Sequence, residues 1–348
     1  MFGLSAKEVY AVGSPDVGDT LESVWGTPGA LVIAGFTAQN TGVLLGGDGQ
    51  GQWSAINQNI TPADVLGMSA ADASHLFAVG QGGQILFSSG AGTWSAQDSG
   101  TQEDLEAVFA ASPTAVWAVG GTNAATIVKS TGNGKWTTET PPDPNAFLYG
   151  VWGSSATDLY AVGAGGAILH STGNGQWAAQ TSGTMNSLHA VWGSSANDVW
   201  VVGTNMILHS TGNGKWTAEK MAPMASLWGI TGRAGDLWAV GSATVNNSNV
   251  GVVYRSHGDG CWAAVKIPAS PPLWSIWSNG TDLLVVGCHT DQNGCPLAPG
   301  ALLHGAGGDF TAEPYFGGQA MSAPGLFAVG GAARPYVAGA AADIWAQQ

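Results

Sequence analysis

The chain repeats itself along most of its length, and this repetition constrains its fold more than any other feature. Segments 151–163 and 191–203 read Val-Trp-Gly-Ser-Ser-Ala-Thr-Asp-Leu-Tyr-Ala-Val-Gly and Val-Trp-Gly-Ser-Ser-Ala-Asn-Asp-Val-Trp-Val-Val-Gly. Each continues into Ile-Leu-His-Ser-Thr-Gly-Asn-Gly and reaches a tryptophan two residues later. Equivalent aromatic residues recur 39 to 48 residues apart: Trp53, Trp94, Trp136, Trp177, Trp216, Trp262 and Phe310. A period near 40 residues indicates a tandem array of like structural units.

One repeat unit predicts four short antiparallel strands. In the unit that contains Trp200, we expect strands at 188–192, 198–202 and 207–210 and a fourth that begins at Trp216. These stretches are rich in β-branched and aromatic residues, and Gly, Asn and Ser separate them. The turn Thr-Gly-Asn-Gly at 211–214 supplies residues that accept positive φ in a tight hairpin. Four such strands in about 42 residues form a β-propeller blade, so the chain is predicted to be all-β.

The blade count depends on how the two ends of the chain are assigned. The first strand of a unit recurs at eight places: around Trp25, Met68, Phe109, Trp152, Trp192, Ile230 and Trp277, and again at 326–331. The last unit continues with strands at 335–339 and 343–347 but has no fourth strand, whereas a strand at 7–12 precedes the first unit. We therefore predict a single eight-bladed β-propeller domain over 1–348, closed by an N-terminal strand within 1–13 and with tandem repeats over 21–348. Closure would remove an exposed sheet edge. A seven-bladed ring with the last segment outside it is the alternative.

The hairpins before the recurring tryptophans carry a family resemblance. They read Ser-Thr-Gly-Asn-Gly-Lys-Trp at 130–136 and 210–216 and Ser-Thr-Gly-Asn-Gly-Gln-Trp at 171–177. This pattern resembles the Asp-box (BNR-like) tandem repeats of bacterial β-propellers, whose hairpins read Ser-x-Asp-x-Gly-x-x-Trp. It departs from them in two respects: no Asp stands at the third position, and the interval from Gly to Trp is one residue shorter. The resemblance implies the fold and little about activity, because such hairpins occur in sialidases, lectins and assembly factors alike.

Composition and charge exclude several classes of function. The chain has 9 basic and 23 acidic residues and a net charge of −14, so it lacks the clustered Lys and Arg that neutralise phosphates or bind anionic membranes. We therefore expect no nucleic-acid partner. No apolar run reaches the roughly 18 residues that a membrane-spanning helix needs, so no membrane insertion is expected. Few Lys and many Gly, Ser, Thr and Asn suit a secreted or periplasmic bacterial protein. No signal peptide is recognisable, and we expect one to have been trimmed.

Residues that repeat in register are interpreted as scaffold. The hairpin tryptophans are expected to pack between neighbouring sheets. Asp158, Asp198, Asp236 and Asp282 precede the second strand of four units and are expected to cap turns by accepting hydrogen bonds from backbone amides. His170, His209 and His304 share one repeat position in different blades, so they cannot converge on a metal ion. No metal and no cofactor are predicted.

One position differs from blade to blade and is therefore the candidate site. In most units it follows a recurring Leu at the start of the first strand, the strand that lines the central channel of a propeller. Its occupants are Glu22, Leu66, Glu106, Tyr149, His189, Trp228, Trp274 and Phe327. Apart from Leu66, we predict that these side chains form a ligand-binding ring at the mouth of the channel. Aromatic faces stack on flat ligands and carboxylates bind hydroxyl groups.

Several functions fit this ring. We favour a non-catalytic, lectin-like binding propeller, expected to be a monomer, that recognises a carbohydrate or similar small polar ligand. The first alternative is a glycan-active lyase or hydrolase that uses Glu22, Glu106, Tyr149 and His189 in acid–base roles. A protein-interaction scaffold is third, and side chains that merely fill a narrow channel are the structural alternative. A sialidase is excluded because that family uses three convergent arginines, whereas this chain has only Arg233, Arg255 and Arg334, of which the first and last are expected on the opposite face.

Two long connections on the same face are expected to wall the site. They join the second and third strands at 242–249 and 288–300. Cys288 and Cys295 bracket part of the second connection and are a candidate disulfide that would staple it, which leaves Cys261 unpaired.

Overall fold

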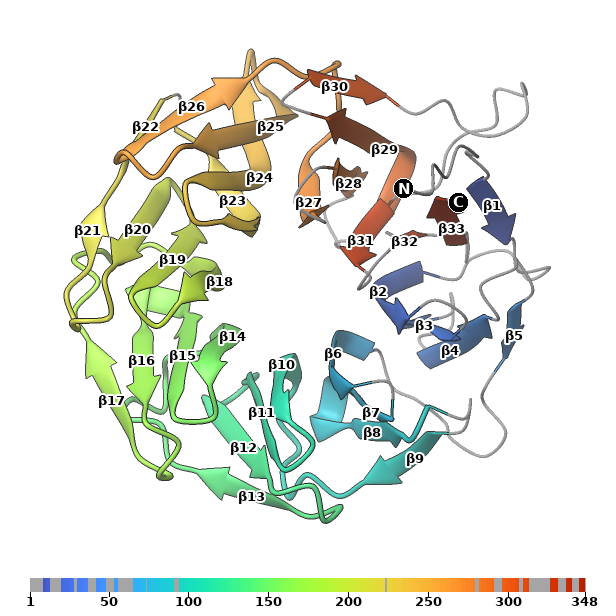
Figure 1. Cartoon of the computed structure of the whole chain (residues 1–348), viewed down its shortest axis with the longest axis vertical. Coiled ribbons are helices and arrows are strands. Elements are labelled where there is room, and N and C mark those ends of the chain that lie inside the picture. Colours follow the sequence, from blue (N-terminus) through green and yellow to red (C-terminus); the bar gives the residue numbers. More distant parts are fainter. Residues whose placement is uncertain are drawn as a thin grey trace, which may run out of the picture.

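The computed structural model describes residues 9–12, 20–27, 30–36, 42–47, 53–55, 65–72, 74–90, 94–222, 224–278, 282–290, 296–306, 309–312, 326–330, 336–339 and 344–347. Within this part of the chain the structure is all-β: strands form sheets that are antiparallel except for one parallel pair, and the only helical segments are two short 3₁₀ turns, η1 (Gln81–Gly83) and η2 (Ala164–Gly166). The sheets stand around a common centre (Figure 1). Each sheet is called a blade below and takes the name of its innermost strand.

The first four blades follow the order of the chain from the centre outward. The β2 blade contains β2 (Thr20–Thr27), β3 (Ala30–Phe36), β4 (Gly42–Gly47) and β5 (Trp53–Ala55). The β6 blade contains β6 (Val65–Asp72), β7 (His75–Gly80), β8 (Ile85–Ser88) and β9 (Trp94–Gln97). The β10 blade contains β10 (Leu105–Ser112), β11 (Ala115–Gly120), β12 (Thr126–Ser130) and β13 (Trp136–Glu139). The β14 blade contains β14 (Leu148–Ser155), β15 (Asp158–Gly163), β16 (Ile168–Ser171) and β17 (Trp177–Gln180).

Of the remaining sheets, the β18 and β27 blades keep this plan, whereas the β23 blade and the last sheet vary it. The β18 blade contains β18 (Leu188–Ser195), β19 (Asp198–Gly203), β20 (Met206–Ser210) and β21 (Thr217–Ala218). The β23 blade contains β23 (Ser226–Arg233), β24 (Asp236–Val245), β25 (Ser248–Ser256), β26 (Cys261–Val265) and β22 (Lys220–Ala222). The β27 blade contains β27 (Leu273–Ser278), β28 (Asp282–Thr290), β29 (Pro296–Ala306) and β30 (Asp309–Ala312). The last sheet contains β31 (Leu326–Gly330), β32 (Tyr336–Gly339), β33 (Ile344–Gln347) and β1 (Val9–Val12).

The N-terminal strand lies in the same sheet as the end of the chain. β1 runs antiparallel to β33, with Val9 opposite Gln347 and Val12 opposite Ile344. The sheet order is β1-β33-β32-β31, so a strand from the beginning of the chain takes the outermost place (Figure 1).

The strands predicted for one unit agree with β18, β19 and β20, which are each longer by one to three residues. The fourth strand begins at Thr217, one residue after Trp216. In the preceding turn, Gly212 and Gly214 have φ of 76° and 75°, a region that glycine adopts without strain. The Asn213 Oδ1 accepts a hydrogen bond from the backbone N–H of Lys215 at 2.9 Å. The repeated Gly-Asn-Gly therefore forms the tight hairpin that the sequence predicts.

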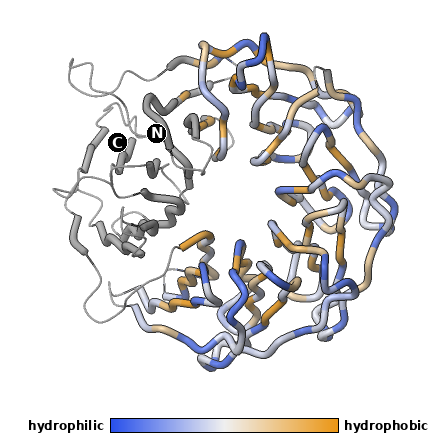
Figure 2. The backbone as a smooth tube through the Cα atoms, turned by 180° about the vertical axis from the view of Figure 1, so that it is seen from behind, coloured by the Kyte–Doolittle hydropathy of each residue, from blue (hydrophilic) through white to orange (hydrophobic). Residues whose placement is uncertain are grey.

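The hydrophobic core lies between neighbouring sheets. Hydrophobic stretches follow the strands, and hydrophilic ones gather at turns on the outer rim (Figure 2). Among the hairpin tryptophans, Trp136, Trp177 and Trp216 each donate the indole N–H to the preceding blade. Trp136 Nε1 bonds to Gln97 Oε1, and Trp216 Nε1 bonds to Gln180 Oε1, both at 2.7 Å. For these residues the prediction of packing between sheets is confirmed.

The repeated aspartates have different partners from those predicted. Asp158 Oδ1 lies 2.8 Å from His170 Nε2, and Asp198 Oδ1 lies 2.9 Å from His209 Nε2, each across two strands of one blade. In the β23 blade the corresponding partner of Asp236 is Arg255 Nε, at 2.8 Å. The expectation of backbone capping was wrong for these three, because a cationic or imidazole side chain on the third strand lies within reach. The side chains of Asp282 and His304 lie outside the described residues.

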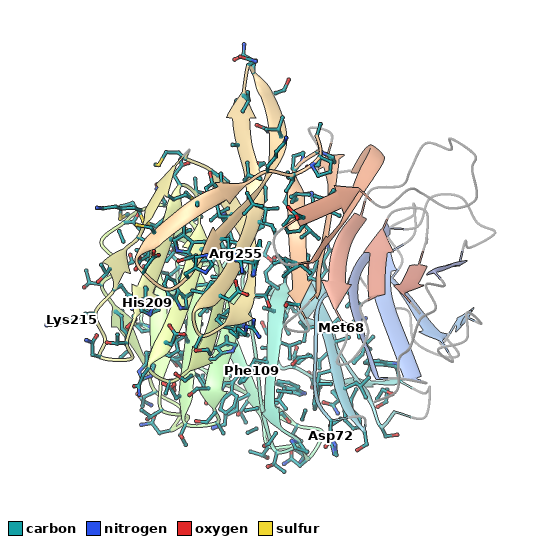
Figure 3. The ribbon with its side chains drawn as sticks, turned by 45° about the horizontal axis from the view of Figure 1, so that its top comes forward. Met68, Asp72, Phe109, His209, Lys215 and Arg255 are labelled. Carbon is teal, nitrogen blue, oxygen red and sulfur yellow. The ribbon has the colours of Figure 1, made fainter. Side chains whose placement is uncertain are left out.

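Two segments depart from the predicted plan. Segment 242–249 was expected to be a loop, but β24 and β25 continue through it as a hairpin that projects from the rest of the molecule (Figure 3). Asn246 and Asn247 form its two-residue turn with φ of 49° and 63°, as a type I′ turn requires. Segment 288–300 is likewise largely strand, although 291–295 lie outside the described residues. β22 leaves the β18 blade and pairs in parallel with β26 of the next blade.

Among the described residues, no helix is long and apolar enough to cross a membrane.

Candidate functional site

The position that differs between blades is a β-bulge in every innermost strand. In the β10 blade, Leu105 pairs with Gly120 and Ala107 pairs with the next residue, Val119, so Glu106 is the extra residue. The register slips at the same place in all eight described innermost strands. The extra residues are Glu22, Leu66, Glu106, Tyr149, His189, Trp228, Trp274 and Phe327. A bulge re-aims its side chain away from the regular alternation, which accounts for the freedom of this position to vary.

In each blade a glycine of the second strand pairs with the residue that precedes the bulge. Gly163 pairs with Leu148, and a Cβ on Gly163 would lie 1.9 Å from the carbonyl oxygen of Phe147. The equivalent distances are 2.0 Å for Gly120 and 2.1 Å for Gly203. Only a residue without a side chain admits this close backbone approach. The recurring Val-Gly that ends the second strand is therefore the sequence signal for the bulge, and it was not recognised as such.

Small residues after the bulge bring the innermost strands together. A Cβ on Gly67 would lie 2.8 Å from the carbonyl oxygen of Glu106 in the next blade. A Cβ on Gly150 would lie 3.2 Å from the carbonyl oxygen of His189. Successive innermost strands thus lie side by side in one register, so the bulge side chains of adjacent blades are neighbours.

Four of the predicted residues form a continuous arc of rings across four blades. The ring centroids of Tyr149 and His189 lie 5.8 Å apart, and those of His189 and Trp228 lie 6.3 Å apart. Trp228 and Trp274 stack at 4.3 Å with an interplanar angle of 29°. We call Tyr149, His189, Trp228 and Trp274 the aromatic arc. The structure thus brings together four side chains that are 39 to 46 residues apart in sequence.

His189 has a defined place in the arc. Its Nε2 lies 3.1 Å from the Oγ1 of Thr204, which follows β19. The Thr204 carbonyl in turn accepts a hydrogen bond from Asn186 Nδ2 at 2.9 Å. Burial lowers the pKa of His189, because a charged imidazolium loses its hydration there. The ring is therefore positioned as a neutral imidazole at neutral pH.

Glu106 occupies the bulge position of the β10 blade, which precedes the β14 blade of Tyr149. Burial raises the pKa of its carboxyl group, and the nearby Asp104 carboxylate raises it further. Within the part of the chain that the structure describes, the Glu106 carboxyl has neither a hydrogen-bond donor nor a cation as partner. It is thus a partly buried acid without a bonding partner in the described part of the chain.

Two neighbouring acids, Glu103 and Asp104, accept hydrogen bonds from backbone N–H groups. Glu103 Oε2 accepts hydrogen bonds from the backbone N–H groups of Thr122, Asn123 and Ala124 at 2.7, 2.6 and 3.2 Å, and these bonds lower its pKa. Asp104 Oδ1 accepts one from Gly82 N–H at 2.8 Å. Both tie the segment that enters β10 to loops between second and third strands. The sequence analysis missed them because their partners are backbone groups far along the chain.

Other predicted residues cannot be placed. The side chains of Glu22 and Phe327 lie outside the described residues, although the backbone puts both at bulge positions. Cys288 and Cys295 likewise lie outside the described side chains, so their disulfide stays a prediction. Cys261 is exposed and has a free thiol. Among the described residues, no three His, Cys, Asp or Glu side chains could together hold a metal ion.

Comparisons with known proteins identify the fold. No family model matches the chain, and no curated protein sequence matches it. A streptogramin B lyase structure aligns with a TM-score of 0.64 at 17% identity, over 84% of this chain and 96% of that one. The structure of YCF48 bound to D1 peptide aligns with a TM-score of 0.59 at 12% identity, over 99% and 96%. The WD40 β-propeller domain of Doa1 aligns with a TM-score of 0.58 at 13% identity, over 80% and 92%.

The chain is a β-propeller with repeated four-stranded antiparallel blades. Similarity at these identities establishes the architecture alone, because propellers of one shape carry unrelated functions. The function has to be argued from the site.

Proposed function

We propose that the chain is a non-catalytic binding propeller whose ligand lies against the aromatic arc at the mouth of the central channel. The ligand class proposed is a carbohydrate or a similar small polar molecule with a flat face. One observation carries the proposal: the bulge position, which the scaffold leaves free to vary, holds four neighbouring rings in blades β14 to β27. Ring faces beside a few polar groups are the usual lining of small-ligand sites.

The exposure of the arc favours a binding site over a channel plug. Tyr149 is 36% exposed, and it is one of the few large hydrophobic side chains at the surface of the described residues. By contrast, Trp136 and Trp177, which pack between blades, are 8% and 7% exposed. A side chain that only filled the channel would be as little exposed to solvent as these two tryptophans.

We also propose the finer features of the fold. The ring has eight blades and is closed by the N-terminal strand, which the pairing of β1 with β33 supports. The hairpins are Asp-box-like, with Asn133, Asn174 and Asn213 accepting a backbone N–H two residues ahead, as an Asp would. The composition supports secretion or a periplasmic location, and the closed ring supports a monomer.

A glycan-active lyase or hydrolase is the second candidate. The raised pKa of Glu106 and the lowered pKa of His189 shift the carboxyl group toward its protonated form and the imidazole toward its neutral form, and acid–base catalysis uses such a pair. Tyr149 stands between them in the register. A scaffold role is third: the YCF48 neighbour carries a bound peptide, so a peptide is a further ligand class to test.

The experiment that tests the proposal is a binding screen with a matched pair of variants. Wild type, Trp274→Phe and Lys215→Ala would be applied to a broad glycan array and titrated with the hits, with product analysis after incubation. Lys215 is exposed in the outer turn between β20 and β21 (Figure 3), whereas the arc residues lie on innermost strands (Figure 1). We expect Trp274→Phe to weaken binding and Lys215→Ala to leave it unchanged, with no product formed. Product formation would favour the enzyme, and binding that is unaffected by Trp274→Phe would move the site elsewhere.

A further inference from the structure

We infer that the joint between the β18 and β23 blades is a latch controlled by a proton. While Glu219 and His209 share a proton, the carboxyl group faces His209 and the indole N–H of Trp262 has no acceptor. When the proton leaves, the carboxylate turns to Trp262 and links the two blades. The same two blades carry His189 and Trp228 of the aromatic arc, but the latch does not depend on which ligand the arc binds.

Three other joints between blades share one hydrogen bond. In each, the indole N–H of a hairpin tryptophan donates at 2.7 Å to a side chain of the preceding blade, three residues after the hairpin tryptophan of that blade. The donors and acceptors are Trp136 with Gln97, Trp177 with Glu139, and Trp216 with Gln180. Either an amide or a carboxylate can therefore close such a joint.

At the fourth joint the same two groups are present, but the bond is not made. Glu219 has the position of these acceptors in its repeat and lies in the same place. A Cβ on Gly260 would lie 3.2 Å from Glu219 Oε2, as one on Gly175 would lie 3.7 Å from Glu139 Oε1. Trp262 is 3% exposed, and its Nε1 has no hydrogen-bond partner among the described residues. A buried donor without an acceptor is costly, so this joint gains stability whenever the acceptor turns to it.

The Glu219 carboxyl faces a histidine instead. Its Oε1 lies 3.9 Å from His209 Nδ1, and the other ring nitrogen, Nε2, lies 2.9 Å from Asp198 Oδ1. The ring is held in this orientation by stacking on Trp200, with centroids 3.9 Å apart. An imidazole that donates its Nε2–H to Asp198 presents a lone pair at Nδ1 when it is neutral. That lone pair repels a carboxylate, so the contact requires a proton on Nδ1 or on Glu219.

The groups around this pair bring its proton within reach of mild changes in pH. The Glu219 side chain is only 7% exposed, and burial raises the pKa of its carboxyl. The His209 imidazolium lowers this pKa, and the Asp259 carboxylate in the turn between β25 and β26 raises it. On the far side of the imidazole the facing charge is Asp198. Loss of the proton is therefore expected above the pH at which an ordinary glutamate titrates.

The β10 blade provides a natural comparison. There a lysine, Lys129, has the repeat position of His209 and lies 3.8 Å from Glu139 Oε1. Its Nζ donates to the Gly173 carbonyl at 2.7 Å, which ties it to the next hairpin. Glu139 keeps its bond to Trp177 beside this cation. A lysine side chain ordinarily keeps its proton between pH 5 and pH 8, whereas a histidine can lose it, so only the joint at His209 is expected to respond to pH.

Indole N–H resonances of the ¹⁵N-labelled protein test the latch. The Trp262 signal, assigned by Trp262→Phe, would be followed from pH 5 to pH 8 in wild type, Glu219→Gln and His209→Phe, each first shown by thermal unfolding to be folded. In wild type we expect the Trp262 proton to move downfield as the pH rises. Its exchange with water, corrected for the intrinsic pH dependence, should slow about tenfold. The Trp177 and Trp216 signals should not titrate and are the internal controls.

Both substitutions should abolish the transition. Glu219→Gln supplies an amide acceptor, as the chain does at two other joints, so Trp262 should be hydrogen-bonded at every pH. His209→Phe introduces the residue that the β6 blade has at this position, Phe87, and removes the proton partner of Glu219. The carboxyl group should then stay at Trp262 throughout the titration.

Three results would overturn the inference. The first is a wild-type Trp262 signal that does not change with pH, whether it is bonded or unbonded. The second is a transition that persists unchanged in either variant, because the titrating group would then lie elsewhere. The third is movement of the Trp177 and Trp216 signals together with that of Trp262, which would mean a change of the whole ring and not a latch at one joint.

Discussion

The indole nitrogen of Trp177 donates a buried hydrogen bond of 2.7 Å to Oε2 of Glu139 in the preceding blade. The other carboxylate oxygen of Glu139 lies 3.8 Å from Lys129 Nζ. In the adjacent blades the equivalent acceptors are neutral amides, Gln97 and Gln180. One link between blades is thus made by an acid in one place and by an amide in two others.

This link predicts a difference between two substitutions. Glu139→Ala leaves the buried Trp177 N–H without an acceptor and should lower the free energy of unfolding by about 2–3 kcal/mol. Glu139→Gln supplies the acceptor that the chain itself uses in neighbouring blades, so it should cost less than about 1 kcal/mol. Urea denaturation of both variants measures this. Equal losses would mean that the charge beside Lys129, and not the hydrogen bond, holds the blades together.

The glycine that accompanies the bulge predicts a large cost for one methyl group. The Cβ of Gly163→Ala would lie 1.9 Å from the Phe147 carbonyl, so the start of β14 must shift. We expect a loss of about 2–4 kcal/mol, in the range of overpacked cores. Gly183→Ala is the control: its φ is +77° but no atom lies within 4 Å, so it should cost only about 1–2 kcal/mol. A Gly163→Ala variant as stable as the control would contradict the bulge geometry.

The lowered pKa of His189 predicts a pH dependence of stability. Burial favours the neutral ring in the folded state, so the unfolded chain binds a proton more readily. The contribution of the group is therefore complete above its unfolded pKa of about 6.5 and is lost as the pH falls through the lower folded pKa. His189→Gln should remove this loss. The free energy of unfolding of the wild type minus that of the variant should therefore decrease as the pH is lowered from 8 to 5. A difference that is flat, or that grows in acid, would show that the ring is not buried as a neutral group.

The N-terminal strand gives a prediction about the ring. Because β1 pairs with β33, deletion of residues 1–13 should expose the edge of β33, lower the midpoint of thermal unfolding and promote aggregation. Thermal unfolding and size-exclusion chromatography of the truncated chain measure this. A truncated chain as stable and as monodisperse as wild type would sink the closure proposal.

Some of this structure was predictable because it repeats. The recurring tryptophans fix the blade period, and unlike residues in one register, from Glu106 to Trp274, mark the mouth. What could not be predicted depends on contacts that the local sequence does not encode. Whether the Asp158 carboxylate binds a backbone amide or the His170 side chain depends on the register in which two strands pair. The parallel addition of β22 to β26 joins segments of adjacent repeats, and its three residues have no distinctive pattern.

The hairpin at 242–249 shows a different limit. The stretch Ser-Ala-Thr-Val-Asn-Asn-Ser-Asn resembles a loop because small and polar residues predominate in it. It is nevertheless strand, because Asn246 and Asn247 accept positive φ and the ladder from Val245 to Leu237 continues unbroken.

The central claim is that a ligand binds against the aromatic arc, and indole N–H resonances test it most directly. The chain has 16 tryptophans, of which Trp228 and Trp274 lie in the arc and others, such as Trp177, lie between blades. With ¹⁵N-labelled indoles assigned by Trp→Phe substitution, titration with a glycan identified in the array should shift the Trp228 and Trp274 resonances in a saturable manner. The Trp136, Trp177 and Trp216 resonances should stay in place. Shifts confined to those hairpin tryptophans, with Trp228 and Trp274 unmoved, would contradict the account.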